Sequence, residues 1–297
     1  ICKLRLWLSM VADIEDEPGE VKPLPNIDFN IQQGNSLLGF VDAEVSVSSD
    51  GKTDLTGWEK KSRFGKIRNA IENHKNADTT AEAEEWRNKA EELIQEQRPR
   101  FNELLLSDFQ SKVDDELTPE ELESWLPFHW PLQFAGVYEA GGFDIVIGNP
   151  PYEGQDRIGY KKQLRKLATD RYGYEYSAKT DLFQFFAHRG QELVRDGGYY
   201  SFIINDTFLM NRNKSDVRKT ILSDVCEITT VNRDAFEVSI ETAIFTVNKG
   251  QKPQTIRYNS SRDAPISSYT MLLDAGEFTS VDDWEEYSLR TTRKGPH

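Results

Sequence analysis

The chain has few of the residues from which disulfide-rich and metal-dependent proteins are built. Its 297 residues include two cysteines, Cys2 and Cys226, and four histidines at positions 74, 129, 188 and 297. Two cysteines cannot form a disulfide framework or a cysteine-rich zinc site, and the histidines have no ligand spacing. We therefore predict no metal site, and the low cysteine content fits a reducing cytoplasm.

Long apolar runs are also missing. No stretch of 18 apolar residues occurs, so we expect no membrane partner. The first residues, Ile1 to Trp7, have the pattern of the middle of an amphipathic helix, not that of a signal peptide. This start inside a helical pattern predicts a fragment of a longer polypeptide.

Basic charge is scarce, with 36 Lys and Arg against 50 Asp and Glu and a net charge of -14. The acids are concentrated between Glu72 and Ser124, where 16 acidic residues face 6 basic ones. Two stretches are basic instead: Arg157–Arg171 has six bases and one acid, and Arg212–Lys219 has four bases and one acid. Taken alone, these stretches have the composition of solvated helix faces.

The N-terminal part of the sequence predicts a mixture of helix, loop and strand. A helix is expected over residues 3–13, with Leu4 and Leu8 on one face. A charged loop over 15–25 leads to a short strand at Asp28–Ile31, and a polar loop follows at 41–54.

The acidic segment predicts helices. Apolar residues recur at helical spacing between Trp58 and Leu105, which indicates two amphipathic helices with charged outer faces. Thr118-Pro119-Glu120-Glu121 matches a capping box. We interpret residues 41–141 as an acidic helical insertion, such as a helical hairpin, inside a catalytic core made of residues 1–40 and 142–257.

The second half alternates strands and helices. Phe143–Gly148 is nearly all apolar, which is typical of a central parallel strand buried on both faces. A helix over 180–195, stopped by Gly197-Gly198, leads to a second buried strand at Tyr199–Ile204. Further along we expect a helix over 214–223 and two strands close enough to pair antiparallel, Val225–Val231 and Thr242–Val247.

This alternation predicts a doubly wound α/β sheet with an antiparallel edge. Beyond Gln254 the sequence becomes polar and irregular. We expect residues 258–297 to begin a separate C-terminal region that contributes to target recognition.

Asn149-Pro150-Pro151-Tyr152 directly follows the Phe143–Gly148 strand, at the end where open sheets place their active sites. The amide oxygen of Asn149 and the carbonyl of Pro150 can accept hydrogen bonds from a planar exocyclic amine such as that of adenine. These bonds would draw the nitrogen toward tetrahedral geometry and aim its lone pair at a methyl donor. Pro151 stiffens the loop, and Tyr152 offers a ring on which a flipped base can stack.

On these residues the chain resembles the gamma-type N6-adenine DNA methyltransferases, and most of all the methylase region of type IIG (Eco57I-like) restriction-modification enzymes. The likeness covers roughly residues 1–250. Besides the tetrad, it is carried by five segments: Lys3–Ser9, Leu24–Leu38, Phe128–Leu132, Lys179–Phe183 and Glu241–Phe245.

The resemblance implies a Rossmann-like sheet that uses S-adenosylmethionine, incomplete at its N-terminus and carrying a helical insertion. It also implies the residues of the site. Cofactor contacts are expected from Asn35, Ser36 and Asn149. Target-base contacts are expected from Tyr152, Phe236 and Asp181.

The Gly-rich loop with which this family holds the methionine end of the cofactor has no counterpart in the sequence. We therefore predict weak or no binding of S-adenosylmethionine by these residues alone. Double-stranded DNA is the expected partner, with Lys161, Lys162 and Arg165 on its phosphates. The remainder of a larger restriction-modification or phage-defence polypeptide is a further expected partner.

Two alternatives remain open at this point. Asn-Pro-Pro-Tyr also serves enzymes that methylate a protein glutamine or an RNA base, because those nitrogens are equally planar. A non-catalytic DNA-binding module is the other alternative. The long insertion and the segment Leu4-Arg5-Leu6-Trp7-Leu8-Ser9 favour the DNA enzymes.

Overall fold

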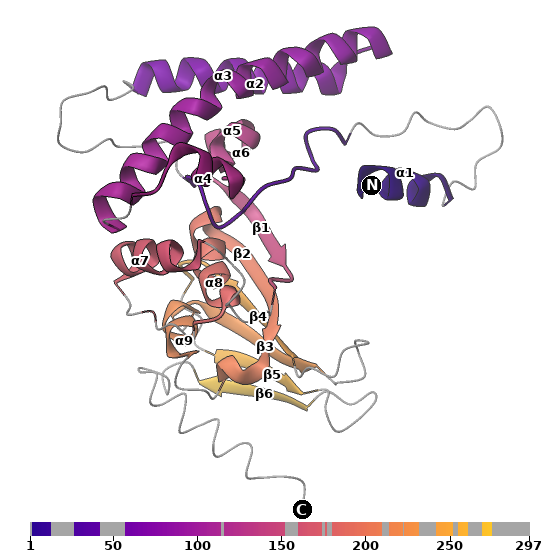
Figure 1. Cartoon of the computed structure of the whole chain (residues 1–297). Helices are drawn as coiled ribbons and strands as arrows, with labels where there is room; N and C mark the ends of the chain where they lie inside the picture. Colours follow the sequence, from indigo (N-terminus) through magenta and orange to yellow (C-terminus); the bar gives the residue numbers. More distant parts are fainter. Residues whose placement is uncertain are drawn as a thin grey trace, which may run out of the picture. The chain divides into compact units, whose positions relative to one another are not determined.

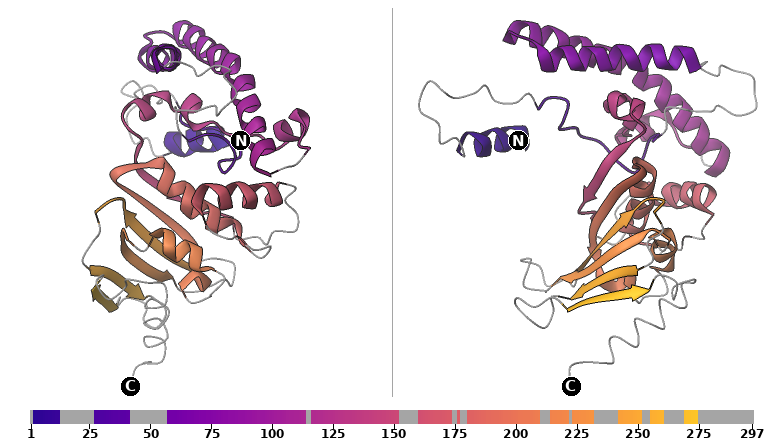
Figure 2. Two further views of the ribbon diagram at one scale, coloured as in Figure 1. Left: turned by 90° about the vertical axis from the view of Figure 1, so that its left-hand side faces the viewer. Right: turned by 180° about the vertical axis from the view of Figure 1, so that it is seen from behind.

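The structure of the chain is a computed structural model (Figures 1 and 2). By their internal contacts, the residues form two compact units. The first comprises residues 1–108 and 117–139, and the second comprises residues 109–116 and 140–297. The residues that the structure describes are 2–12, 27–41, 57–113, 116–151, 160–173, 176, 180–209, 214–221, 223–231, 242–251, 255–260 and 269–274.

The first unit is built from helices in its described part. They are α1 (Cys2–Ala12), α2 (Gly57–Asn76), most of α3 (Thr80–Val113), α4 (Pro119–Ser124), α5 (Trp130–Gln133) and α6 (Ala135–Glu139). The predicted N-terminal helix and the two amphipathic helices are thus confirmed. Among the described helices of the chain, none is long and apolar enough to cross a bilayer.

Helices α2 and α3 pack together through their apolar faces (Figure 1). Ile67 of α2 and Ala90 and Ile94 of α3 are buried in one cluster, which Phe29 also joins. The segment around Phe29 therefore packs with the helices, although the predicted limits assigned it to the α/β core. The α2–α3 pair buries its apolar stripe in this way and turns its charged side outward.

The predicted strand at 28–31 is wrong. Asp28–Asn30 form a turn, because the backbone N–H groups of Asn30 and Ile31 both donate to the carbonyl of Ile27, at 3.0 and 3.3 Å. The predicted capping box is confirmed. Thr118 Oγ1 accepts from the N–H of Glu121 at 3.2 Å, and Glu121 Oε2 accepts from the N–H of Thr118 at 3.0 Å.

The second unit is organised around a six-stranded sheet in the order β1-β2-β4-β3-β5-β6. Strands β1 and β2 are parallel, β4 is antiparallel to both β2 and β3, β5 is parallel to β3, and β6 is antiparallel to β5. The bounds are β1 (Phe143–Gly148), β2 (Val194–Asn205), β3 (Val225–Val231), β4 (Thr242–Asn248), β5 (Thr255–Ser260) and β6 (Tyr269–Asp274).

The C-terminal strands correct the expected layout. The β3–β4 antiparallel pair is confirmed, but it lies inside the sheet and does not form its edge. The expectation of irregular structure beyond Gln254 is wrong, because β5 and β6 continue the sheet there. The predicted boundary between residues 257 and 258 falls inside β5.

Strand β1 lies at one end of the sheet and not at its centre. In the described part of the chain it pairs with β2 alone, and Ile145 and Ile147 are 64% and 78% exposed. The prediction that β1 is buried on both faces is therefore wrong. Its apolar composition is real, but within this unit it is covered only on the side of Val146, which packs against the core.

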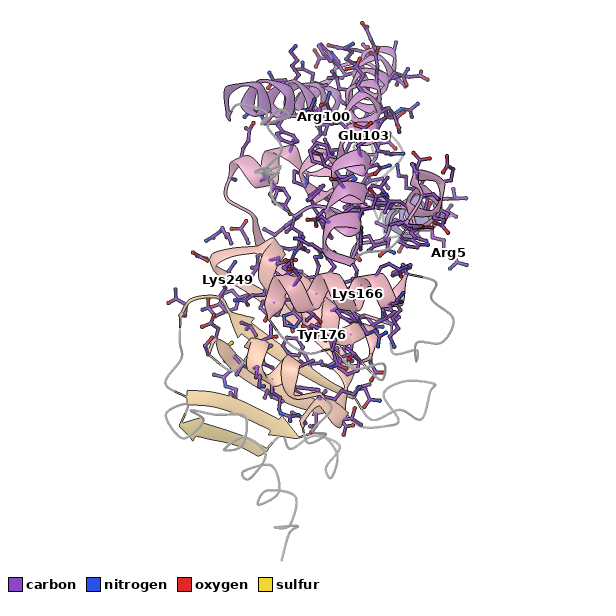
Figure 3. The ribbon with its side chains drawn as sticks, turned by 60° about the vertical axis from the view of Figure 1, so that its left-hand side comes forward. Arg5, Arg100, Glu103, Lys166, Tyr176 and Lys249 are labelled. Carbon is purple, nitrogen blue, oxygen red and sulfur yellow. The ribbon has the colours of Figure 1, made fainter. Side chains whose placement is uncertain are left out.

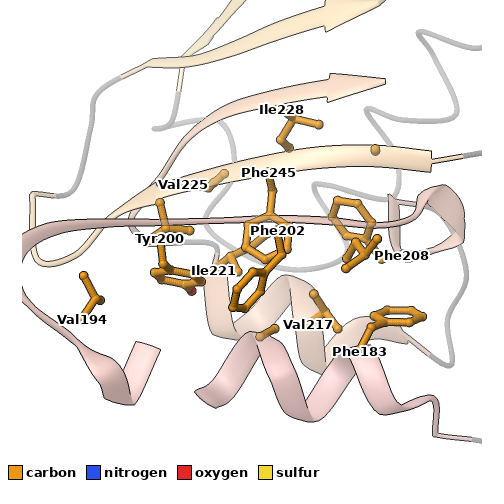
Figure 4. Close-up of a cluster of buried hydrophobic side chains, with 14 residues drawn as sticks. Phe183, Val194, Tyr200, Phe202, Phe208, Val217, Ile221, Val225, Ile228 and Phe245 are labelled. Carbon is orange, nitrogen blue, oxygen red and sulfur yellow. The ribbon is translucent and has the colours of Figure 1, made fainter. Parts of the chain in front are cut away.

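Three helices, α7 (Lys161–Tyr172), α8 (Leu182–Leu193) and α9 (Ser215–Ile221), lie on one face of the sheet, as both figures show. We call this the covered face, and the face that carries Ile145, Ile147 and Tyr199 the open face. The core lies between the covered face and the helices (Figure 4). Its largest fully buried apolar side chains include Tyr200, Phe183, Phe208 and Phe245.

The second strand begins earlier than its sequence predicts. Helix α8 ends at Leu193 and β2 starts at Val194, so Gly197 and Gly198 lie inside the strand and do not stop the helix. Gly197 has a φ of +75°, and the pairing with β1 changes register in this region. The two glycines thus allow an irregular strand start, which glycine tolerates better than other residues.

Candidate functional site

The Asn-Pro-Pro loop, residues 149–151, follows β1 directly at the carboxyl edge of the parallel pair β1–β2. Asn149 and Pro151 are exposed, whereas Pro150 is buried. The buried proline anchors the loop while leaving the Asn149 side chain at the surface. Asn149 is thus an exposed residue at the end of β1, and its catalytic role stays a prediction. Tyr152, the last residue of the predicted tetrad, lies outside the described residues.

A polar cluster lies at the start of α8, in the same unit. Lys214 forms an ion pair with Asp181 and donates a hydrogen bond to Gln184 Oε1 at 3.2 Å. Gln184 Oε1 also accepts from the backbone N–H of Asp181 at 2.8 Å. Lys214 Nζ lies 5.3 Å from the centre of the Phe183 ring. The carboxylate of Asp181 is thereby held in place by a buried cation.

Lys214 and Gln184 were missed in the sequence analysis. The spacing of Asp181 and Gln184 is that of a capping box, which is a signal that the sequence does contain. No local pattern marks Lys214, because it lies 33 residues from its partner. The prediction that Asp181 contacts the target base stays a prediction.

The second basic stretch, 212–219, is directed inward in its described part. Lys214 and Arg218 are buried, at 6% and 0% exposure. Arg218 donates to the carbonyl of Phe208 at 2.5 Å, and Phe208 lies in the short 3-10 helix η1 (Asp206–Leu209) that follows β2. The interpretation of this stretch as a solvated helix face is therefore wrong for these two residues. Arg218 thus braces the chain just after β2, and Lys214 braces the start of α8.

The first basic stretch forms α7. Lys162 is exposed and Arg165 is half-buried, whereas Lys161 is buried at 7% exposure. Leu164 and Leu167 turn inward, so the helix presents one basic side to solvent; Lys166 is labelled in Figure 3. The predicted role of Lys161 on DNA phosphates stays a prediction, although the residue as a whole is buried. Lys162 and Arg165 keep that prediction.

The predicted cofactor turn, residues 35–38, lies in the first unit. Asn35 Oδ1 accepts from the N–H of Leu37 at 3.3 Å, and the Asn35 N–H donates to the carbonyl of Leu126 at 2.7 Å. The carbonyl of Ser36 accepts from the indole N–H of Trp130 at 3.3 Å. These bonds fix the backbone on both sides of the two predicted cofactor residues, whose own role stays a prediction.

His129 supports the same segment and was not predicted as a site residue. Its Nδ1 accepts from the N–H of Phe40 at 3.4 Å, so Nε2 carries the proton that is donated to Asn102 Oδ1 at 2.9 Å. Burial, with the nearby charge of Arg98, lowers the pKa of His129 to about 3. The imidazole therefore stays neutral and links α3 to Phe40, two residues after the predicted cofactor turn. No sequence spacing connects Phe40, Asn102 and His129.

Phe236, the remaining predicted target-base residue, lies outside the described residues. Asn35 and Ser36 belong to the first unit, and Asn149 and Asp181 belong to the second. Within the second unit, the described site thus consists of the Asn-Pro-Pro loop, the Asp181–Lys214–Gln184 cluster and the exposed side of α7.

An α/β sheet with an Asn-Pro-Pro loop after its parallel strand β1 is the arrangement that the sequence resemblance leads us to expect. The comparison with protein families agrees with this expectation. The model of the Eco57I restriction-modification methylase family matches residues 1–238, and the chain belongs to that family.

Two curated relatives have related descriptions. A putative type II restriction enzyme and methyltransferase of Methanocaldococcus jannaschii is 24% identical over 273 residues, which is 76% of this chain and 22% of that protein. The type II methyltransferase M.BstVI of Geobacillus stearothermophilus is 34% identical over 104 residues, 33% of this chain and 18% of that protein. The chain thus spans about a fifth of the length of the curated relatives it matches.

Solved structures of restriction-modification enzymes are similar at a lower level. The type IIG restriction endonuclease BpuSI aligns with a TM-score of 0.36 and 17% identity, over 54% of this chain and 18% of that protein. The type IIL enzyme MmeI in complex with DNA aligns with a TM-score of 0.37 and 15% identity, over 47% of this chain and 20% of that protein.

Proposed function

We propose that this chain carries the catalytic loop of a DNA methyltransferase that modifies the exocyclic amine of adenine. The observation that best supports this proposal is the exposed Asn149 beside a buried Pro150 at the carboxyl end of β1. Membership of a restriction-modification methylase family makes DNA the preferred substrate over a protein glutamine or an RNA base.

The proposed chemistry needs two hydrogen-bond acceptors and no strong base. The amide oxygen of Asn149 and the carbonyl of Pro150 accept the two N–H bonds of the adenine amine, which leaves its lone pair free to attack. The new N–C bond forms as the methyl group leaves its donor, and the nitrogen then releases one proton to water. Proline contributes no N–H of its own, so the carbonyl has no adjacent donor competing for the site.

S-adenosylmethionine, when bound, supplies the electrophilic methyl group. The chemistry of the turn around Asn35 fits the adenine end of this cofactor. The Asn35 amide carries both donor and acceptor groups. Its backbone N–H donates to the carbonyl of Leu126, and its side-chain Oδ1 accepts from the N–H of Leu37. Asn35 and Ser36 would hold the adenine ring.

Binding of the cofactor tests this part directly. Residues 1–297 alone should bind S-adenosylmethionine weakly or not at all, because the sequence holds no Gly-rich loop for its methionine end. Isothermal calorimetry measures this. Micromolar binding by residues 1–297 would contradict the expectation.

The catalytic proposal is tested in the full-length protein with duplex DNA and labelled S-adenosylmethionine. Asn149→Ala should reduce methyl incorporation by on the order of 100-fold or more, since it removes an acceptor aimed at the reacting nitrogen. Asn88→Ala, at an exposed position of α3, is the matched control and should leave the rate unchanged. Methylation of a release factor or ribosomal RNA in place of DNA would overturn the choice of substrate. Equal rates for the two variants would overturn the role of Asn149.

A further inference from the structure

The residue before the catalytic asparagine packs against an aromatic ring. Gly148 pairs with Phe202 across β1 and β2. A Cβ placed on Gly148 would lie 2.9 Å from Cε1 and 3.1 Å from Cδ1 of the Phe202 ring. A carbon at 2.9 Å overlaps the ring, so an alanine at this position would require the ring or the strand to move.

The ring has no room to move away, because a second glycine lies on its other side. A Cβ on Gly190 of α8 would lie 2.9 Å from Cε2 and 3.0 Å from Cζ of Phe202, and 2.8 Å from Cδ2 of Tyr200. The Phe245 ring packs edge-on at 6.0 Å, and the Tyr200 ring lies at 5.9 Å (Figure 4). Phe202 itself is buried, at 4% exposure. The ring is thus enclosed by β1, α8 and two aromatic neighbours.

Space, and not backbone torsion, explains both glycines. Gly197 and Gly250 have positive φ values, whereas Gly148 and Gly190 do not. An alanine would therefore adopt their backbone conformation without strain. At Gly148 the Phe202 ring excludes it, and at Gly190 the Phe202 and Tyr200 rings exclude it together. The Phe202 ring is the one that contacts both positions, so it limits how closely β1 and α8 approach each other.

We propose that Phe202 is a positioning residue for Asn149. Its ring is held between Gly148 and Gly190, and it sets the place of the last β1 residue and so of the amide that follows. This proposal rests on the proposed function of Asn149. It adds a residue of β2 and one of α8 to the determinants of the catalytic loop.

The test compares alanine variants in the full-length protein by kcat and KM for duplex DNA and by thermal midpoint. Gly148→Ala should lower kcat by about 10- to 100-fold with a smaller change in KM, because a small misplacement of a catalytic group costs this much. Gly190→Ala should act in the same direction by pushing the ring toward β1. Should Gly148→Ala fail to fold, Gly190→Ala carries the test when it is also made in the Phe202→Leu background, because a Cβ at Gly190 would meet Tyr200 as well as Phe202.

Gly198→Ala is the matched control. A Cβ there would lie 2.8 Å from the Asp144 carbonyl oxygen, an equally tight contact between the same two strands but at their opposite end. It should lower the thermal midpoint as Gly148→Ala does and change kcat by less than about threefold. An equal loss of kcat in both variants would overturn the proposal, since destabilisation alone would then explain the effect.

A double variant tests whether the ring carries the effect. In the Phe202→Leu background, the smaller side chain leaves room for a methyl group, so Gly148→Ala should reduce kcat by less than about threefold. Retention of the full loss in that background would refute the role of Phe202. Asn149→Ala separates the two hypotheses. Unchanged methylation by Asn149→Ala rejects the proposed function. If Asn149→Ala loses methylation but Gly148→Ala keeps a normal kcat, only the positioning role is rejected.

Discussion

The two faces of the sheet in the second unit carry different chemistry. On the covered face, Tyr200 and Phe202 of β2 and Phe245 of β4 are buried under the helices. On the open face of the same strands, Ser201 and Thr246 form a hydrogen bond at 3.1 Å, a pair that tolerates water. The open face of β1 differs again, because it carries the exposed side chains of Ile145 and Ile147. The open face of the sheet is thus polar at these middle strands and apolar at β1.

The largest effect is expected on the covered face. Phe245→Ala removes a ring with 0% exposure that contacts Tyr200, Phe202 and Phe208. The free energy of unfolding should fall by about 3–5 kcal/mol, from lost burial and the cavity left behind. Urea unfolding measures it. A loss below about 1 kcal/mol would mean that this face is less tightly packed than its burial indicates.

The helical layer over the covered face should respond to pH. His188 of α8 stacks on Tyr172 at 4.1 Å, lies 2.5 Å from Tyr176 Oη through Nε2, and lies 3.0 Å from Thr220 Oγ1 through Nδ1. Burial lowers the pKa of His188 to about 3 from an ordinary value of 6.5. The contribution of neutral His188 to stability is therefore complete above pH 6.5 and is lost as the pH falls toward 3.

Between pH 6.5 and pH 4 this loss should reach about 3 kcal/mol, and His188→Gln should remove it from the pH dependence of unfolding. The pKa of His129 is also lowered to about 3, so His129 contributes separately to the pH dependence of unfolding. His129→Gln measures that contribution. Identical pH profiles for wild type and His188→Gln would show that His188 is not the group that titrates.

A smaller effect is expected at the polar pair of the open face. Ser201→Ala leaves Thr246 without its side-chain partner and should cost about 1 kcal/mol or less, since both residues are only half-buried. The double variant Ser201→Ala with Thr246→Val should cost less than the sum of the two single changes. Additive losses in thermal unfolding would show that the two hydroxyls act independently.

The smallest effect is expected at Ile147. Because its side chain is 78% exposed, Ile147→Ser should change the free energy of unfolding by less than about 0.5 kcal/mol. Val146→Ser, on the other side of the same strand, is the control and should cost more, since Val146 packs on the core. A large loss in Ile147→Ser would show that the open face of β1 is covered in solution.

Periodicity and local motifs predicted much of this structure. The helices α1 to α3, the capping box at Thr118 and the strands β1 to β4 all follow from repeating apolar positions or from local hydrogen-bonding patterns. The place of β1 in the sheet could not be predicted, because an apolar strand looks the same whether or not neighbours cover both its faces. Strand β5 was missed because most of its residues are polar, and β6 was missed although it contains the apolar run Met271-Leu272-Leu273, because polar residues surround that run on both sides.

The site divides in the same way. The Asn-Pro-Pro-Tyr motif was recognisable because its four residues are contiguous and follow a strong strand signal. The burial of Lys161 and Lys214 was not predictable, since a basic residue gives no sign of whether its helix side faces solvent. His129 and Phe202 depend on partners far away in the sequence, Asn102 and Gly148, and so no local pattern marks them.

The outer edge of β1 has a practical consequence for anyone who produces these residues in isolation. In the described part of the chain, that edge presents backbone N–H and C=O groups without a neighbouring strand, beside two exposed isoleucines. Such edges recruit strands from other molecules and promote aggregation. In preparations of residues 1–297, the fraction of monomeric protein should therefore fall as the protein concentration rises. Ile147→Lys would place a positive charge beside this edge and should reduce aggregation.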